Sequence, residues 1–130
     1  MRSLVLEDDY VSSALLKAIL SPFGDVDIAD NGREGLDLFE KALNEENPYD
    51  LVCLDIMVPN MDGQEVLIEI RHLEEVKDIY GHDAVKIIMT TALGDFENVR
   101  QAFREQCEDY LVKPIDKDKL LKKIKDMGLI

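Results

Sequence analysis

The sequence predicts an α/β domain built on a doubly wound parallel sheet. Short apolar runs rich in Val, Leu and Ile alternate along the 130 residues with longer segments of helical period. Continuous apolar runs are typical of strands that are buried on both faces of a parallel sheet. Their alternation with helices implies right-handed crossovers between strands. We therefore expect five strands and five helices in a single domain, residues 1–130.

Each predicted element has its own apolar pattern. Four strands are continuous runs, at Ser3–Leu6, Leu51–Leu54, Val85–Met89 and Tyr110–Val112, and an edge strand is predicted where Val26 and Ile28 alternate with aspartates. Stripes at spacings of three, four or seven residues predict helix faces that pack on the sheet. The stripes are Val11, Leu15, Ala18 and Ile19; Leu36, Phe39 and Leu43; Val66, Leu67, Ile70 and Leu73; Phe96, Val99 and Phe103; and Leu120, Leu121 and Ile124. Pro22 and Pro48 end the first two helices, and Asp62-Gly63 opens the third.

The chain is strongly acidic, with 28 Asp and Glu against 15 Lys and Arg and a formal net charge of −13. A negative surface repels phosphate groups, so we expect no binding to nucleic acid or to membranes. No apolar stretch reaches the roughly 20 residues of a membrane span, and Cys53 and Cys107 form no disulfide framework. These features predict a cytoplasmic protein.

The charge is unevenly spread along the chain. Residues 113–130 contain six lysines and three aspartates, a net +3, which leaves −16 on residues 1–112. A basic helix face of this kind is either solvated or a docking surface for a partner, and charge alone does not decide between the two.

Polar side chains follow four of the predicted strands. Glu7 and Asp8 come after the first strand, Asp55 ends the third, Thr91 closes the fourth and Lys113 follows the fifth. The carboxyl ends of parallel strands meet at one edge of an open sheet, where such folds bind ligands. We expect these side chains to meet there, although each alone is also an ordinary turn, cap or strand-end residue.

The chemistry of this set predicts phosphoryl transfer to a carboxylate. Carboxylates that lie close together repel unless a cation neutralises them, and Mg²⁺ prefers oxygen ligands. Beside such an ion Asp55 would be the nucleophile and form an aspartyl-phosphate. Lys113 would share the charge of the phosphoryl oxygens, and Thr91 would hydrogen-bond one of them.

Four segments resemble a known family, namely Leu4–Asp9, Asp50–Gly63, Ile87–Ala92 and Asp109–Pro114. Together they resemble the response-regulator receiver domain of two-component signalling, the CheY-like fold, from Leu4 to about Met127. The stretch L-D-I-M-x-P-x-M-D-G is its most diagnostic part. The resemblance implies a flavodoxin-like (βα)5 sandwich with strand order 2-1-3-4-5.

The resemblance assigns a phosphoacceptor and a metal site. It makes Asp55 the phosphoacceptor and places Mg²⁺, or Mn²⁺, on Glu7, Asp8, Asp55 and the backbone carbonyl of Met57. The first acid of the pair is Glu7, where Asp is more frequent in the family.

The resemblance also assigns the residues that respond to the phosphoryl group. Thr91 and Lys113 would contact the phosphate, Thr91 and Tyr110 would form the switch, and Lys113–Pro114 would be a cis peptide. One departure is that Gln106-Cys107 stands where the family often has Gly-Ala, so we expect the fourth helix to end differently.

By the same resemblance, a histidine kinase or a histidine phosphotransfer protein donates the phosphoryl group. The domain would catalyse only its own phosphorylation and dephosphorylation. The signal would reach a downstream protein through the fourth helix, the fifth strand and the fifth helix, residues 116–127. We expect a receiver domain without an attached effector domain, as a monomer or a phosphorylation-dependent dimer.

Two apolar residues predict a long-lived phosphoryl group. Met57 and Leu93 lie two positions beyond Asp55 and Thr91. Hydrolysis needs a water in line with the phosphorus, and neither side chain can hydrogen-bond such a water. We therefore expect slow self-dephosphorylation.

Three other functions fit the sequence less well. A small Mg²⁺-dependent phosphatase of the haloacid dehalogenase type would have a second Asp where Met57 stands. In a flavodoxin-like electron carrier, Glu7, Asp8 and Asp9 would repel the FMN phosphate. A phosphorylation-independent adaptor is disfavoured because every expected site position holds a chemically competent residue.

Overall fold

A five-stranded parallel sheet forms the centre of the computed structural model, which describes residues 1–58, 61–92 and 94–130. The strands are β1 (Ser3–Leu6), β2 (Val26–Ala29), β3 (Leu51–Asp55), β4 (Lys86–Thr91) and β5 (Asp109–Val112). Their order is β2-β1-β3-β4-β5, and every neighbouring pair is parallel. The predicted fold class and strand order are confirmed.

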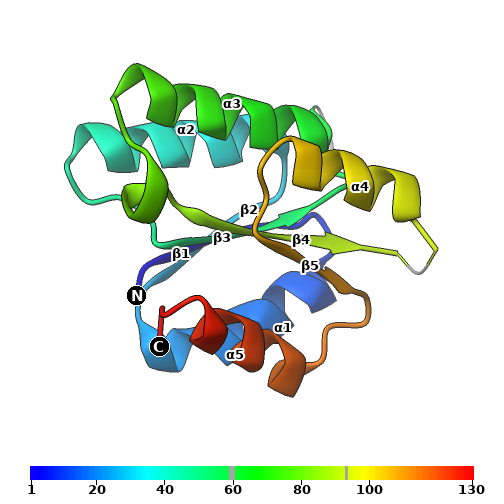
Figure 1. Cartoon of the computed structure of the whole chain (residues 1–130). Coiled ribbons are helices and arrows are strands. Elements are labelled where there is room, and N and C mark those ends of the chain that lie inside the picture. Colours follow the sequence, from blue (N-terminus) through cyan, green and yellow to red (C-terminus); the bar gives the residue numbers. More distant parts are fainter. Residues whose placement is uncertain (59–60, 93) are drawn as a thin grey trace.

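Helices cover both faces of the sheet, as Figure 1 shows. They are α1 (Tyr10–Leu20), α2 (Gly32–Asn44), α3 (Gly63–Val76), α4 (Phe96–Arg104) and α5 (Lys117–Asp126), with short 3₁₀ turns η1 (Ser21–Phe23) and η2 (Gly81–Asp83). α2, α3 and α4 lie on one face, and α1 and α5 lie on the other. α1 ends before Pro22 and α3 begins after Asp62, as predicted, whereas α2 already ends at Asn44.

The apolar residues of each central strand divide between two cores. Val52 and Leu54 of β3 belong to the core under α2, α3 and α4, whereas Leu51 and Cys53 belong to the core over α1 and α5. All four are at most 1% exposed. Because successive side chains of a strand point to opposite faces, burial on both faces requires a continuous apolar run.

Two predicted helix faces were wrong in part. In α1, Ile19 is buried as predicted, but Val11 is 72% exposed and Leu15 is 40% exposed. Leu16 and Leu20 are buried in their place. α1 carries apolar residues around much of its circumference, so spacing alone does not select the face that packs.

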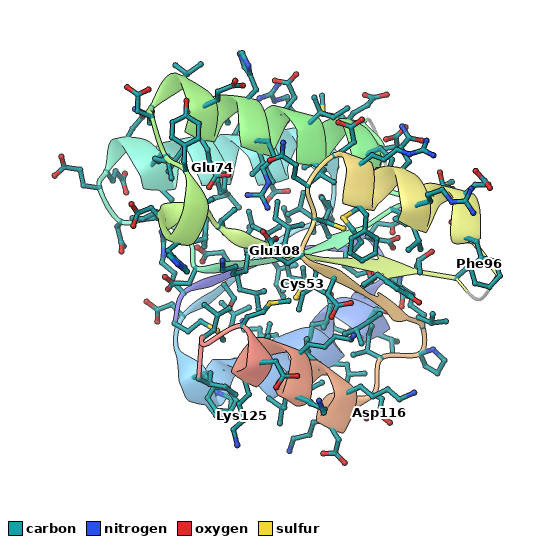
Figure 2. All side chains as sticks on the ribbon, viewed as in Figure 1. Cys53, Glu74, Phe96, Glu108, Asp116 and Lys125 are labelled. Atoms are coloured by element: carbon teal, nitrogen blue, oxygen red, sulfur yellow. The ribbon has the colours of Figure 1, made fainter. Side chains whose placement is uncertain are left out.

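The predicted stripe of α4 was also wrong at its two ends. Phe96 is 72% exposed and Phe103 is 43% exposed, while Val99 and Ala102 are buried. Figure 2 shows Phe96 projecting from the start of the helix. The buried face of this nine-residue helix is formed by small aliphatic side chains, and its aromatic residues lie toward solvent.

The end of α4 takes a left-handed residue without the glycine that is common there. Gln106 has φ +76°, a region that favours glycine. Arg71 of α3 stabilises this turn, because its Nε and one terminal nitrogen donate to the Gln106 carbonyl at 3.0 and 2.7 Å. The helix therefore ends in the conformation that glycine would give, and a neighbouring side chain holds it from outside.

Arg71 also organises two carboxylates at the amino ends of the strands. Its terminal nitrogens lie 2.7 Å from Glu74 Oε1 and 2.9 Å from Glu108 Oε1. The second oxygen of Glu74 accepts the Val85 N–H at 2.7 Å, and Glu108 Oε2 accepts the Ile87 N–H at 2.5 Å. We call Arg71, Glu74 and Glu108 the amino-edge cluster; Figure 2 labels its two glutamates.

Candidate functional site

The backbone fixes the predicted site residues at the carboxyl ends of the strands. The Glu7 N–H donates to the Ala29 carbonyl at 3.0 Å, and the Lys113 N–H donates to the Thr91 carbonyl at 2.8 Å. These bonds continue the sheet hydrogen bonding beyond β1 and β5. Glu7 and Lys113 are therefore positioned by the sheet itself, and Lys113–Pro114 is cis, as the resemblance implied.

Asp55 ends β3 and is held on both of its carboxylate oxygens. Oδ1 accepts the Met57 N–H at 2.9 Å, and Oδ2 accepts Lys113 Nζ at 2.7 Å. The residue is 7% exposed. Both carboxylate oxygens are thus held in place, and the carboxylate lies at the carboxyl edge of the sheet next to the Lys113 ammonium group.

Gly63 allows the start of α3 to approach the backbone of Asp55. Its N–H donates to the Ile56 carbonyl at 2.8 Å. A Cβ at position 63 would lie 2.4 Å from the Asp55 carbonyl oxygen, closer than atoms can pack. The Asp62-Gly63 pair therefore does more than open a helix, because it also sets the position of the strand end that carries Asp55.

Glu7 is a buried acid with an incompletely neutralised charge. It is 2% exposed, and its Oε1 lies 2.5 Å from Lys113 Nζ while Oε2 accepts the Asp9 N–H at 3.2 Å. Burial, together with the neighbouring Asp55, raises the pKa of Glu7 to about 7, against the opposing effect of Lys113. The site therefore favours an additional positive charge.

Asp8 and Asp9 are both exposed but differ in what they contact. Asp8 belongs to the carboxylate cluster described below. Asp9 caps α1, with Oδ2 accepting the Ser12 N–H at 3.0 Å and the Ser12 hydroxyl at 2.7 Å. These bonds lower the pKa of Asp9. Its exclusion from the predicted acid pair agrees with this geometry.

The three acids predicted to bind a cation lie together. Glu7, Asp8 and Asp55 each offer an oxygen, and these oxygens lie within 4.8 Å of one another. Three carboxylates and the Lys113 ammonium leave a net negative charge when all are ionised. An all-oxygen, negative and partly exposed donor set fits Mg²⁺ or Mn²⁺, which bind proteins through carboxylates and water.

Thr91 lies at this edge, but its hydroxyl points to other partners. Asp55 pairs with Thr90 in the register of β3 and β4, so Thr91 is one residue beyond. Within the described chain, the Thr91 hydroxyl has two acceptors within reach of its single proton, Asp95 Oδ2 at 3.3 Å and the Ala92 carbonyl at 3.4 Å, and makes no bond to Asp55 or Lys113. Sequence reasoning missed Asp95, since an aspartate before a helix resembles an ordinary N-cap.

Tyr110 lies within β5, and Met57 comes two residues after the end of β3. The half-buried Tyr110 ring meets Phe103 edge-on, with 6.1 Å between centroids. The side chain of Met57 lies beside Asp55 in sequence and is 69% exposed. Leu93 falls outside the described residues. The roles of Tyr110, Met57 and Leu93 stay predictions.

The cysteines take no part in this site. Cys53 and Cys107 are buried, and burial raises the pKa of each thiol to about 12. Neither thiol is a nucleophile at neutral pH. No helix of the described chain is both long and apolar enough to cross a bilayer.

Comparison with known proteins identifies the class. The profile of the response regulator receiver domain matches residues 4–125. The chain therefore belongs to the response regulator receiver family, a family of two-component signalling domains.

Individual relatives agree with this class. The chain is 35% identical over 121 residues to the regulatory protein VanRB of Enterococcus faecalis, covering 93% of this chain but 49% of that protein. It thus spans about half of that relative's length, so VanRB as a whole is no guide to this chain's activity.

Two solved structures are also similar. One is the receiver domain of Ssk1 from Saccharomyces cerevisiae, crystallised with the histidine phosphotransfer protein Ypd1, with TM-score 0.84, 28% identity and coverage of 98% and 88% of the two chains. The other is the receiver domain of the sensor histidine kinase PA1611 from Pseudomonas aeruginosa with a magnesium ion in its active-site cleft, with TM-score 0.77, 26% identity and coverage of 98% and 97%.

Proposed function

We propose that this receiver domain takes a phosphoryl group from a phosphohistidine onto Asp55, in the presence of Mg²⁺ or Mn²⁺, and then presents a changed surface to a downstream protein. The observation that carries the proposal is the carboxylate cluster of Glu7, Asp8 and Asp55 with Lys113 bonded to two of its members. A histidine kinase or a histidine phosphotransfer protein would be the donor.

The metal, when bound to Glu7, Asp8, Asp55 and the Met57 carbonyl, would supply positive charge to the phosphoryl oxygens. Asp55 attacks phosphorus with one carboxylate oxygen as the phosphorus–nitrogen bond of the phosphohistidine breaks, and the released imidazole takes a proton. Since Lys113 already bonds Asp55 Oδ2 at 2.7 Å, only a short movement brings its ammonium onto the new phosphoryl oxygens.

The phosphoryl group then changes the positions of two side chains, Thr91 and Tyr110. The Thr91 hydroxyl would donate to a phosphoryl oxygen, and the Tyr110 ring would move inward into the space that Thr91 leaves. Both residues are on β4 and β5, beside α4, so their movement changes the surface of these elements.

The proposed output surface comprises α4, β5 and α5. Four lysines of α5 are exposed, namely Lys117, Lys119, Lys122 and Lys125, of which Figure 2 labels Lys125. The exposed Phe96 and Phe103 of α4 add apolar contact area. A partner with an acidic, partly apolar surface fits this face. The absence of nucleic acid binding, the cytoplasmic location and the monomer or phosphorylation-dependent dimer stay predictions.

The test is phosphorylation by a small donor. The protein is incubated with acetyl phosphate and Mg²⁺, and its intact mass is measured. We expect an adduct of one phosphoryl group that requires the metal and is absent in Asp55→Asn. Asp37→Asn is the matched control, since Asp37 is an exposed acid of α2 paired with Arg33, and it should be phosphorylated normally.

Two results would redirect the proposal. If neither an adduct nor a beryllofluoride-induced spectral change forms, the domain is a phosphorylation-independent adaptor. If added phosphoesters turn over, the domain is a phosphatase. The second result is disfavoured, because the position of the second catalytic Asp in such enzymes is occupied by the largely exposed Met57.

A further inference from the structure

The residue that precedes α4 differs from those that precede the other helices. Asp9, Asn31, Asp62 and Asp116 each accept the backbone N–H three residues ahead and so cap α1, α2, α3 and α5. Asp95 makes no such bond, and its ψ of 54° differs from the extended backbone of the other four. Its carboxylate is therefore available to other donors.

Both oxygens of Asp95 are used by side chains. Oδ2 accepts the Thr91 hydroxyl at 3.3 Å, and Oδ1 accepts the Asn98 side-chain amide at 2.8 Å. The backbone carbonyl of Asn98 in turn accepts the side-chain amide of the buried Gln64 at 2.5 Å. A continuous series of contacts thus joins the end of β4 to the first turn of α4 and to α3.

We infer that Asp95 is a positioning residue that holds the Thr91 hydroxyl toward α4 in the unphosphorylated protein and competes with the phosphoryl group on Asp55 for it. The inference rests on the proposed function. A threonine hydroxyl has a single proton to donate. When Thr91 donates to a phosphoryl oxygen, its bond to Asp95 must break.

This competition has a structural consequence. Breaking the Thr91–Asp95 bond removes one side-chain contact between the end of β4 and the residue that precedes α4, so the position of α4 on the sheet is less restrained. Asp95 would then oppose phosphorylation. It would also carry the effect of phosphorylation from Thr91 to α4, since the same carboxylate joins Thr91 to Asn98. A bond that exists in only one of two states shifts their balance by its own free energy.

The size of the effect follows from the geometry. The bond is long, at 3.3 Å, and Asp95 is only half-buried, which places its contribution toward the lower end for a bond to a charged group. Removing the carboxylate should tighten the binding of beryllofluoride, which mimics the phosphoryl group, by about three- to tenfold.

The test is a titration of the Mg²⁺-loaded full chain with beryllofluoride, followed by NMR, in the parent, Asp95→Ala, Thr91→Ala and the double variant. We expect tighter binding in Asp95→Ala and no gain from Asp95→Ala when Thr91 is already Ala. Asp95→Ser is the second variant, because serine lacks the carboxylate but is a favourable residue before a helix, and this variant should also bind beryllofluoride more tightly.

Two outcomes would overturn the inference. Equal affinity of the parent and both Asp95 variants would show that Asp95 does not restrain Thr91. A gain that persists in the Thr91→Ala background would show that Asp95 acts by charge repulsion alone. Either result leaves the proposed function intact, whereas failure of the parent to bind beryllofluoride would overturn the proposed function itself.

Discussion

Carboxylates surround a cationic side chain at both edges of the sheet, but the two edges differ in how completely these groups are hydrogen-bonded. At the amino edge, Arg71 lies between Glu74 and Glu108; at the carboxyl edge, Lys113 lies between Glu7 and Asp55. Each edge thus has one cation between two carboxylates that are largely shielded from solvent. The differences between them explain why one edge stabilises the fold and the other can bind a ligand.

At the amino edge nearly every polar group has a partner. The planar guanidinium divides its donors between two carboxylates and two backbone carbonyls, and each carboxylate also accepts a backbone N–H. At the carboxyl edge the cation is a point charge, and a third acid, Asp8, joins the group. The groups of the amino edge are therefore hydrogen-bonded to one another and to the backbone, whereas the carboxyl edge, with its third carboxylate, favours an external cation.

The largest expected effect comes from removing the cation of the amino edge. Arg71→Ala leaves Glu74, which is 3% exposed, and Glu108 without their partner and releases the Gln106 turn. We expect the free energy of unfolding to fall by about 3 kcal/mol, as measured by urea denaturation. Arg100→Ala is the control: Arg100 is exposed and lies 3.7 Å from Glu97, so its loss should cost less than about 0.5 kcal/mol.

At the carboxyl edge we expect a substitution to raise the free energy of unfolding instead of lowering it. Glu7→Gln removes a buried charge beside Asp55, so the metal-free protein at pH 8 should become more stable by about 1–2 kcal/mol. The same variant should lose most of the stabilisation that Mg²⁺ gives the parent. Thermal unfolding with and without Mg²⁺ measures both effects.

The matched change at the amino edge is Glu74→Gln. It should destabilise the protein and leave the response to Mg²⁺ unchanged, because Glu74 lies outside the carboxylate cluster. If Glu7→Gln and Glu74→Gln shifted stability in the same direction, the distinction between the two edges would be wrong.

A smaller change in the free energy of unfolding is expected from a substitution at the end of α4. Gln106→Gly should raise the free energy of unfolding by up to about 1 kcal/mol, because Gln106 has φ +76° and Arg71 bonds its backbone carbonyl, which glycine retains. Glu105→Gly is the control: Glu105 has φ −87°, so glycine there should destabilise. Chemical denaturation compares the two variants, and a loss of stability in Gln106→Gly would argue against strain at this turn.

The smallest effect concerns the lifetime of the phosphoryl group. Met57 is largely exposed beside Asp55, and an asparagine in its place could hydrogen-bond the attacking water. We expect Met57→Asn to shorten the phosphoryl half-life about threefold, less than 1 kcal/mol in the barrier, and the further change Leu93→Glu to shorten it more. Decay of the phosphoprotein mass measures it, with Val76→Asn on α3 as control; an unchanged half-life in the double variant would contradict the prediction.

The features that could be predicted from the sequence are those that depend on the local order of residues. Continuous apolar runs predicted the parallel sheet, and the strand ends predicted where Glu7, Asp55 and Lys113 meet, because both depend on local order in the sequence. The helix faces were harder: Val11 and Phe96 match a helical stripe yet are largely exposed. Which apolar face packs depends on neighbouring elements and not on spacing alone.

The amino-edge cluster and the Asp95 contact were not predictable in this way. Arg71 and Glu74 lie one turn apart on α3, but Glu108 comes just before β5, 37 positions from Arg71, and no sequence motif links the three. Asp95 looks like a helix cap in the sequence, and only the side-chain geometry shows that it bonds Thr91 instead. Partner choice among common polar residues is a property of the packed structure.

The proposed function depends above all on Asp55 as the residue that accepts the phosphoryl group. Borohydride reduction of the phosphorylated protein converts an aspartyl-phosphate to homoserine, and peptide mass spectrometry then locates it. We predict homoserine at position 55 of the parent, with Glu7, Asp8 and Asp9 unchanged. Reduction at any other acid, or none in a protein that carries the phosphoryl adduct, would contradict the assignment.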